Sequence, residues 1–333
     1  MSTDSEVRPS HVADEDTTTP GLAVVIPTRN RGARVVATLD SIFAHGSGEL
    51  EVVVVDQSDG RETEAAVERF TGRPDFHYVR SDTRGSSAGR NVGGAIVSRE
   101  LIAFTDDDCL VASDWLKHIA NAFERDPSVA VVFGGVEGPT THDGSLVVTT
   151  YEPSGPFLAR GLTDKHRVEG IAGCMAVRRS LWCVLGGFDE LMGIGAPFLA
   201  GEETDFIIRT LAAGHFVFES PAVRVVHTGS VPSLEVPAVI DRYWFGTGAA
   251  FGKSLKRRPT STAMILFRMA GRWAFGRPPV ASILGGQLHR GRRFWAFLRG
   301  LAVGANQPVD PLTGRFAGNH ERFVNSIGGQ KPT

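Results

Sequence analysis

Three consecutive carboxylates, Asp106, Asp107 and Asp108, follow the apolar run that ends at Thr105. Neighbouring carboxylates repel one another and are costly to bury without a compensating cation. Side chains alternate along a strand, so Asp106 and Asp108 should point the same way. Two oxygen ligands on one side suit Mg²⁺ or Mn²⁺, whose free coordination positions commonly hold a diphosphate. A solvated acidic turn is the alternative interpretation of so short an acidic run.

A second pair of carboxylates, Glu202 and Glu203, follows Gly201 and opens a segment with helical apolar spacing. A carboxylate in such a position can take the proton from an attacking hydroxyl group. Acidic residues also favour the first turn of a helix through its dipole alone. His227 follows the apolar run 223–226, and an imidazole beside carboxylates accepts Mn²⁺ better than Mg²⁺, although a lone histidine is usually structural.

Apolar runs that alternate with segments of helical spacing predict the elements that position these residues. Strands are predicted at 22–26, 52–55, 76–79 and 101–105, and helices at 35–43, 62–70, 86–97 and 115–123. This alternation favours an α/β fold with a mostly parallel sheet, in which ligands bind beyond the carboxyl ends of the strands. Polar residues follow Ile26, Val55 and Thr105, where that rule places a ligand.

The second half of the chain is less regular. Strands are predicted at 129–133, 146–150 and 223–226, and helices at 178–185 and 203–213. Beyond Pro237 the sequence changes to helical segments rich in arginine, glycine and aromatic residues. We therefore predict a polar disordered tail at 1–20, an α/β domain at 21–235 and a basic, mainly helical region at 236–333.

Composition is ordinary for a globular protein, with 42% hydrophobic and 22% charged residues among 333. The three cysteines, Cys109, Cys174 and Cys183, have no metal-like spacing, so we expect them reduced and buried in a reducing compartment. No apolar run resembles a secretory signal or a membrane span, which predicts a cytoplasmic protein.

Several segments occur in a fixed order, each at a strand-to-loop junction. They are VVIPTRNR, VVVVDQSDG, RGSSAGRNVGG and FTDDDC, followed by IAGCMAVRRSLWCVLGGFDE and AGEETDFIIRTLAAGHFV. This ordered set resembles glycosyltransferase family 2 across residues 22–230. The resemblance implies the GT-A fold, a Rossmann-like nucleotide-diphospho-sugar transferase sheet. It also implies inverting transfer of a sugar from a nucleotide-diphosphate donor to an acceptor hydroxyl group, in cell-envelope, polysaccharide or glycolipid synthesis.

The resemblance assigns nucleotide contacts to the first loops and to the arginine-containing segment. The residues implied are Pro27, Thr28, Arg29, Asn30, Asp56, Arg90, Asn91, Asp106 and Asp107. A carboxylate at Asp56 can accept from N3–H of uracil, and equally from a thymine or guanine edge, so UDP is favoured while dTDP and GDP stay open. The alternative for Asp56 is an Asx-turn over Ser58 and Gly60. Arg90 can neutralise phosphate or fix the neighbouring aspartates.

The family pattern also implies the metal ligands and the catalytic base. Asp106, Asp108 and His227 would hold Mn²⁺ or Mg²⁺. Asp106 and Asp108 would divide the metal and ribose contacts between them, with Asp108 as the direct metal ligand. The family's base occupies the second acidic position, which is Glu203 here, with Glu202 as the fallback. Glutamate replaces the usual aspartate at that position, which leaves the choice between the two open.

Two rival functions compete with glycosyl transfer. A nucleotidyltransferase acting on sugar phosphates should carry a glycine-rich loop with arginine or lysine after the first strand, and PTRNRG lacks that glycine density. A non-catalytic nucleotide-sugar-binding protein would need a broken site, whereas Asp106, Asp108, Glu203 and His227 are all present.

The carboxyl-terminal region is strongly basic. From Tyr243 to Val309 there are eleven lysines and arginines and no aspartate or glutamate, and aromatic and aliphatic residues lie between them. Such a pattern predicts peripheral binding to an anionic membrane surface at its inner face. The alternative is that these helices only pack on the α/β domain. We expect no nucleic-acid partner, because the catalytic motifs give no reason for one.

Overall fold

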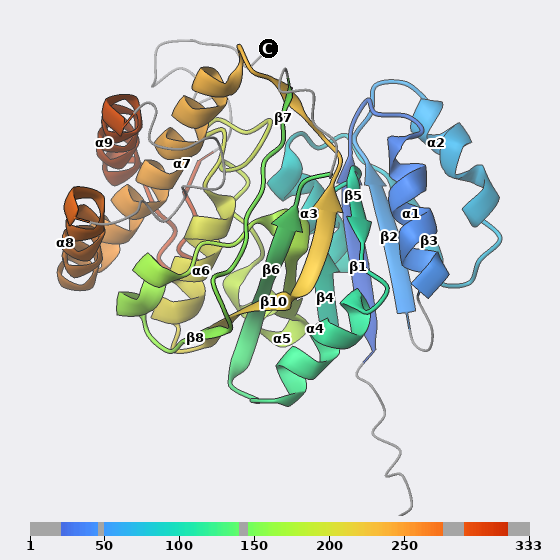
Figure 1. Cartoon of the computed structure of the whole chain (residues 1–333), viewed down its shortest axis with the longest axis horizontal. Coiled ribbons are helices and arrows are strands. Elements are labelled where there is room, and N and C mark those ends of the chain that lie inside the picture. The colour runs from blue at the N-terminus through green and yellow to red at the C-terminus, as the bar shows by residue number, and fades with distance from the viewer. Residues whose placement is uncertain (1–20, 46–49, 140–145, 276–289, 319–333) are drawn as a thin grey trace, which may run out of the picture.

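A computed structural model describes residues 21–45, 50–139, 146–275 and 290–318, so the predicted tail at 1–20 lies outside the described residues. The described strands form a nine-stranded sheet in the order β3-β2-β1-β4-β9-β6-β10-β5, with β8 paired to β10 (Figure 1). A separate two-stranded sheet joins β7 and β11. The strands are β1 (Leu22–Thr28), β2 (Leu50–Asp56), β3 (Phe76–Arg80), β4 (Leu101–Phe104), β5 (Cys109–Val111), β6 (Val129–Glu137), β7 (Leu146–Val147), β8 (Phe157–Ala159), β9 (Met175–Arg178), β10 (Phe216–His227) and β11 (Val231–Pro232).

The first four strands along the chain follow the sequence prediction. β1, β2, β3 and β4 pair in parallel, and every residue of β1 and β2 is buried, which explains their continuous valine and isoleucine content. Gly93 of α3 lets that helix approach β1 closely, since an added Cβ would lie 2.3 Å from Cγ1 of Val25. The helices of this half are α1 (Arg34–His45), α2 (Glu62–Val67), α3 (Ser86–Ile96) and α4 (Trp115–Glu124).

The second half makes the sheet mixed instead of mostly parallel. β9 runs antiparallel to both β4 and β6, and β10 is parallel to β6 but antiparallel to β5 and β8. A parallel strand is usually reached through a helical crossover. β9 instead follows a short 3₁₀ turn (Ala172–Cys174). The predicted last strand is longer than 223–226, because β10 continues through a register shift between Ser220 and Arg224.

Helix α6 carries the predicted catalytic carboxylates at its first two positions. It begins directly after Gly201, whose φ of +89° is a left-handed conformation that favours glycine. An added Cβ at Gly201 would lie 2.5 Å from the carbonyl carbon of Gly246, so the chain entering α6 touches the backbone of the helix behind it. The helices of this part are α5 (Arg179–Leu185) and α6 (Glu202–Ala212).

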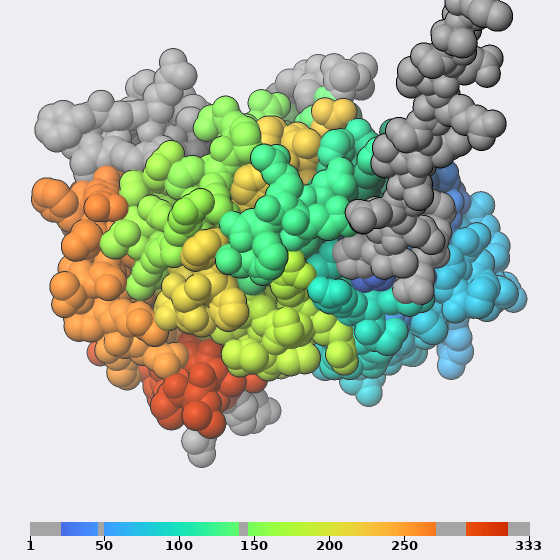
Figure 2. All heavy atoms as spheres, turned by 90° about the horizontal axis from the view of Figure 1, so that it is seen from below, coloured from blue at the N-terminus to red at the C-terminus, as the bar shows by residue number. Residues whose placement is uncertain are grey.

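Three helices form the carboxyl-terminal part: α7 (Val236–Arg257), α8 (Pro259–Phe275) and α9 (Arg290–Asn306). They lie together on the flank of the molecule opposite β3 and α2, as both views show (Figures 1 and 2). Glycines let α7 and α9 approach each other closely. A Cβ added to Gly252 would lie 2.2 Å from the Leu301 oxygen, and one added to Gly304 would lie 2.3 Å from the Ala249 oxygen.

A buried lysine ties α7 to α6 and to the loop that precedes it. The ammonium group of Lys253 contacts Asp189, and it lies 2.7 Å from an oxygen of Asp205 on α6. The other oxygen of Asp205 accepts from Nε of Arg209 at 2.8 Å. The backbone N–H of Phe316 donates to Asp189 at 2.6 Å. The carboxyl-terminal part therefore supplies countercharge and a hydrogen bond to residues near the predicted base.

The cysteines depart from the prediction at one position. Cys109 and Cys174 are buried, but Cys183 is exposed, and all three are free thiols. Cys183 lies on α5, whose buried side consists of Leu181, Trp182 and Leu185, so its own position faces away from the core. Within the described residues, no helix is long and apolar enough to cross a membrane.

Candidate functional site

The acidic cluster, defined as Asp106, Asp107 and Asp108, lies in the turn between β4 and β5 at the carboxyl end of the parallel strands. Thr28, the last residue of β1, donates through its hydroxyl to Asp107 at 2.5 Å. Burial raises the pKa of Asp107 to about 6, although the charge of Arg31 acts in the opposite direction. The predicted carboxylates are therefore held against the end of the first strand.

Arg31 forms ion pairs with two members of the acidic cluster. Its Nη1 lies 2.8 Å from Asp107 Oδ1 and also contacts Asp108 Oδ2. The loop around it turns through two left-handed residues, Asn30 (φ +53°) and Gly32 (φ +51°). Sequence reasoning assigned no role to Arg31, although its charge and its place directly after the first strand were a usable signal.

His227 meets Asp108 at the end of β10, which pairs with β5 in antiparallel register. The imidazole Nε2 lies 3.3 Å from Asp108 Oδ1, and Nδ1 lies 3.3 Å from the carbonyl of Thr149. Burial lowers the pKa of His227, but the hydrogen bond and charge of Asp108 outweigh burial and raise it. Burial would raise the pKa of Asp108, yet the contacts with His227 and Arg31 lower it to about 2.

The donor set fits a divalent cation held by two protein ligands. No group of three or more His, Cys, Asp or Glu side chains that could hold a metal occurs in the part of the chain that the structure describes. Asp108 and His227 are nevertheless adjacent, and Gly229 leaves space beside them, since an added Cβ would lie 2.4 Å from Asp108 Oδ2 and 2.8 Å from His227 Nε2. One or two protein ligands with substrate phosphates is a common way to hold Mg²⁺. Asp106, the third predicted ligand, forms an ion pair with Arg90.

Arg90 connects the acidic cluster to the start of α6. It is buried on α3, with Nη2 2.7 Å from Asp106 Oδ1 and Nη1 3.4 Å from Glu202 Oε1. The Ser86 hydroxyl lies 3.4 Å from the same Glu202 oxygen. Burial raises the pKa of Glu202, and the charge of Arg90 opposes that rise. Asp106 and Glu202, which lie nearly a hundred positions apart in the sequence, thus share one buried arginine.

Glu203 is partly exposed at the amino end of α6, where its Oε1 accepts the backbone N–H of Ala172 at 3.0 Å. Burial, together with the charge of the adjacent Glu202, raises the pKa of Glu203 to about 8. General bases work best when their pKa lies near the operating pH. Of the two glutamates, Glu203 is the one without an arginine ion pair and with access to the surface.

The residues predicted to contact the base and ribose form a second group at the ends of β1 and β2. Asp56 is fully buried; it accepts from the Tyr78 hydroxyl at 2.7 Å and from the backbone N–H of Ser58 at 2.9 Å. The Ser58 contact is the Asx-turn that the alternative interpretation described. Arg29 and Asn30 both donate to Asp59, while Pro27 is buried within β1.

Asn91, which was predicted to contact the nucleotide, bonds the backbone of Phe188. Its amide donates to the Phe188 carbonyl at 3.0 Å and its oxygen accepts the Phe188 N–H at 2.8 Å. These two bonds hold the loop before α6 in place. Thr228 is a residue that sequence reasoning missed: its N–H and hydroxyl both donate to the carbonyl of Asp108, at 2.8 and 2.9 Å.

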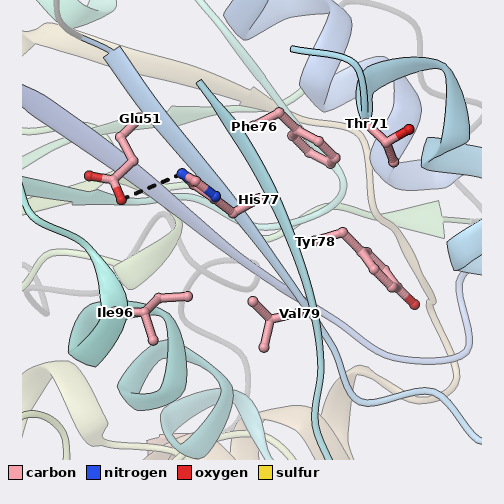
Figure 3. A pocket seen from close by; sticks show the side chains of 7 residues that line it. All are labelled: Glu51, Thr71, Phe76, His77, Tyr78, Val79 and Ile96. Atoms are coloured by element: carbon pink, nitrogen blue, oxygen red, sulfur yellow. Dashed lines mark ion pairs between the residues drawn. The ribbon is translucent and has the colours of Figure 1, made fainter. Parts of the chain in front are cut away.

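A surface pocket elsewhere on the molecule is separate from this site. It lies along β3 at the edge of the sheet, between that strand and the end of α3, and His77, Val79 and Ile96 are among the residues that line it (Figure 3). None of the predicted site residues lines it. Tyr78 connects the two, because it lines the pocket and its hydroxyl donates to Asp56.

Comparison with known proteins identifies relatives of this arrangement. Residues 23–185 match the family described as glycosyl transferase family 2. The pre-mycofactocin glycosyltransferase of Mycobacterium tuberculosis is 27% identical over 259 residues, covering 74% of this chain and 50% of that protein. The chain spans between about half and two thirds of the length of the first curated relatives that it matches.

Two solved structures share the fold. The S. aureus TarS fragment in complex with UDP-GlcNAc has a TM-score of 0.57 at 15% identity, with 86% of this chain and 82% of that one covered. The mannosyltransferase PcManGT from Pyrobaculum calidifontis, in complex with GDP-Man and Mn²⁺, has a TM-score of 0.52 at 22% identity, with coverages of 90% and 89%. Both support the predicted GT-A fold, a mixed α/β sheet flanked by helices.

Proposed function

Because the chain belongs to glycosyl transferase family 2 through residues 23–185, we propose that it moves a sugar from a nucleotide diphosphate to an acceptor hydroxyl group with inversion at the anomeric carbon. The observation that carries this proposal is the link through Arg90, which joins Asp106 of the acidic cluster to Glu202 at the start of α6. Arg90 thereby contacts both a carboxylate of the proposed donor site, Asp106, and one of the two candidate bases, Glu202.

The proposed reaction is a single displacement. Glu203 takes the proton from the acceptor hydroxyl group as its oxygen attacks the anomeric carbon, and the bond from that carbon to the diphosphate breaks. One base and one direct attack give inversion. Arg90 keeps Glu202 and Asp106 in place, which leaves Asp106 oriented towards the ribose side of the donor. Glu202 stays the fallback base.

Asp108 and His227 would hold the divalent cation, Mn²⁺ or Mg²⁺. When bound, the cation neutralises the charge that develops on the leaving diphosphate. The contact from His227 Nδ1 to a carbonyl favours a proton on that nitrogen, so that Nε2 can serve as the ligand. The neighbour PcManGT, which was solved with Mn²⁺, supports this part of the proposal.

UDP is the favoured donor nucleotide, with dTDP and GDP as alternatives. The TarS neighbour was solved with UDP-GlcNAc and PcManGT with GDP-Man, so the fold accommodates both bases. Thr28, Arg29 and Asn30 lie at the end of β1 beside Asp56, where we place the base and ribose. A thermal-shift comparison of UDP, dTDP and GDP with Mn²⁺ tests the choice; a larger shift with GDP would contradict it.

Transfer and metal dependence are tested together by screening nucleotide sugars with Mn²⁺. Asp108→Ala should abolish turnover, while Asp126→Ala should not, because Asp126 is a partly exposed turn residue far from the site. NMR of the product should show inverted configuration. Binding of donor with neither transfer nor hydrolysis would favour a non-catalytic nucleotide-sugar-binding protein. Release of diphosphate from a nucleoside triphosphate and a sugar phosphate would favour a nucleotidyltransferase. Full activity of Asp108→Ala in EDTA would contradict the metal site.

We also propose that the carboxyl-terminal helices bind an anionic membrane surface. Phe267 on α8 and Trp295 on α9 are 79% and 69% exposed, and Phe294, next to Trp295, is 44% exposed. Arg268 and Arg292 accompany them on the same helices. Basic helices with exposed aromatic residues suit the lipid interface, and each basic residue near an anionic leaflet contributes about 1 kcal/mol. The predicted contribution of residues 276–289 lies outside the described residues.

Membrane binding is tested with point substitutions, because a truncation within α7 would remove the buried Lys253. The full chain should co-sediment with anionic vesicles at low salt, and less at high salt. Phe267→Ser with Trp295→Ser should reduce that binding, whereas Leu312→Ser, which removes an even more exposed apolar side chain outside the helices, should not. Equal binding to anionic and neutral vesicles would contradict the proposal and leave packing as the role of these helices.

A further inference from the structure

We infer that Arg31 occupies the place of the divalent cation on Asp107 and Asp108 while no donor is bound, so that the cation must displace it. The inference rests on the proposed function, because it takes Asp108 as a metal ligand. It concerns a residue to which neither the motif pattern nor the metal site assigns a role. Arg31 would thereby couple metal binding to donor binding.

The contacts of Asp108 carry the first step. One oxygen faces Nε2 of His227 at 3.3 Å, and the other contacts Nη1 of Arg31. The same Nη1 lies 2.8 Å from Asp107. Both oxygens of the proposed ligand are thus committed to positive or potentially positive groups. A cation that binds Asp108 through either one displaces or weakens an existing contact.

Exposure shows which partner can leave. The side chains of Asp107 and Asp108 are 5% and 6% exposed, whereas that of Arg31 is 43% exposed. The guanidinium therefore reaches the buried carboxylates from the solvent side. The backbone around it is anchored: the N–H of the preceding Asn30 donates to the Ser58 hydroxyl at 2.7 Å, the Asn30 side chain bonds Asp59, and the carbonyl of Arg31 itself accepts the N–H of Arg34 at 3.2 Å. Release of Arg31 requires side-chain rotation alone.

Charge balance gives the functional consequence. Arg90 remains with Asp106 and Glu202, so Arg31 supplies the positive charge nearest to Asp107 and Asp108 apart from His227. A donor diphosphate brings negative charge that can receive both the cation and the released guanidinium. When the cation binds without a nucleotide, no diphosphate is present to pair with the released guanidinium of Arg31. Metal and nucleotide should therefore bind with positive coupling, and Arg31 should be the source of part of it.

The test measures binding of Mn²⁺ to the full chain by electron paramagnetic resonance of the free ion, with and without UDP. Arg31→Gln removes the competing charge and should tighten Mn²⁺ binding without UDP by roughly tenfold or more, because charges a few ångströms apart interact strongly near a protein surface. Arg31→Lys keeps the charge and should stay near wild type. Arg34→Gln, the same charge change at an exposed position three residues later, should have no effect.

The outcomes separate this inference from the proposed function. If Arg31→Gln binds Mn²⁺ without UDP as weakly as the wild type, or more weakly, while wild type binds Mn²⁺ with UDP, the competition is refuted and the metal site stands. If no variant binds Mn²⁺ even with UDP, both the competition and the metal site fail. A melting temperature of Arg31→Gln close to wild type confirms that the comparison concerns folded protein.

Discussion

Removing the charge of Lys253 should strongly destabilise the fold. Lys253 is 2% exposed and its ammonium group contacts both Asp189 and Asp205, which are each 1% exposed. Replacement by methionine keeps most of the side-chain volume but leaves two buried carboxylates without their common cation. Removing one partner of a buried ion pair typically costs about 3–5 kcal/mol.

The contacts that remain after Lys253 is replaced determine how the lost stability divides between Asp189 and Asp205. Asp205 keeps Arg209, whose Nε donates at 2.8 Å, so that carboxylate stays paired. Within the described part of the chain, Asp189 keeps only backbone donors, from Phe316 at 2.6 Å and from Leu191 at 3.1 Å. Asp189 should therefore carry most of the cost. Against a total stability of about 5–15 kcal/mol, a loss of about 3–5 kcal/mol moves the protein close to unfolding at physiological temperature.

Urea unfolding followed by tryptophan fluorescence measures the effect. Lys253→Met should lower the unfolding midpoint strongly, and adding Asp189→Asn should recover a large part of the loss, because the orphaned charge is removed. Lys256→Met is the matched control on the same helix: its ammonium group donates to the exposed Gln307 carbonyl, and we expect less than about 1 kcal/mol. A Lys253→Met loss no larger than that of the control would refute the reasoning.

Three further outcomes are expected. Glu203→Gln should keep donor binding and lower kcat by about 10²–10⁴, the usual worth of a positioned base, and the same loss in Glu202→Gln alone would move the assignment by one residue. In the wild type kcat should rise with pH as Glu203 loses its proton and level off above about 8, a dependence that a pH profile of Glu203→Gln should lack. Gly252→Ala should lower stability by about 1–3 kcal/mol because its Cβ would meet the Leu301 oxygen, whereas thermal melting of Gly291→Ala, which has open space, should show no loss.

Continuous apolar runs made the first half of the fold predictable. Strands such as β1 and β2 are buried on both faces, so their residue types alone identify them, and the carboxyl ends of parallel strands meet at one edge. The acidic cluster therefore lies where the sequence analysis expected it. β5 and β8 were not predicted because each has only three residues, too few for a periodic signal.

The details of the site depend on contacts between distant segments, which no local pattern contains. Arg31 lies 76 and 77 residues from its two aspartate partners, and Lys253 lies 64 residues from Asp189. Motif order located the carboxylates but did not show which cation neutralises each. Asn91 illustrates the same limit: it lies beside Arg90 in sequence, yet its amide bonds the backbone of Phe188.

The contacts of Asp189 with Lys253 and Phe316 affect the order of events during synthesis. Asp189 leaves the ribosome well before Lys253, with which it forms an ion pair. Phe316, whose N–H also donates to Asp189, follows 127 positions after it. At about 5–20 residues per second, the loop before α6 waits roughly 6–25 s for its last hydrogen bond. A nascent chain stopped before α7 would contain the parallel strands of the first half. Its Asp189 and Asp205 would lack the ammonium group of Lys253. The contacts that neutralise and anchor Asp189 can therefore form only after synthesis has passed Lys253 and Phe316, so that chains terminated before α7 would lack both.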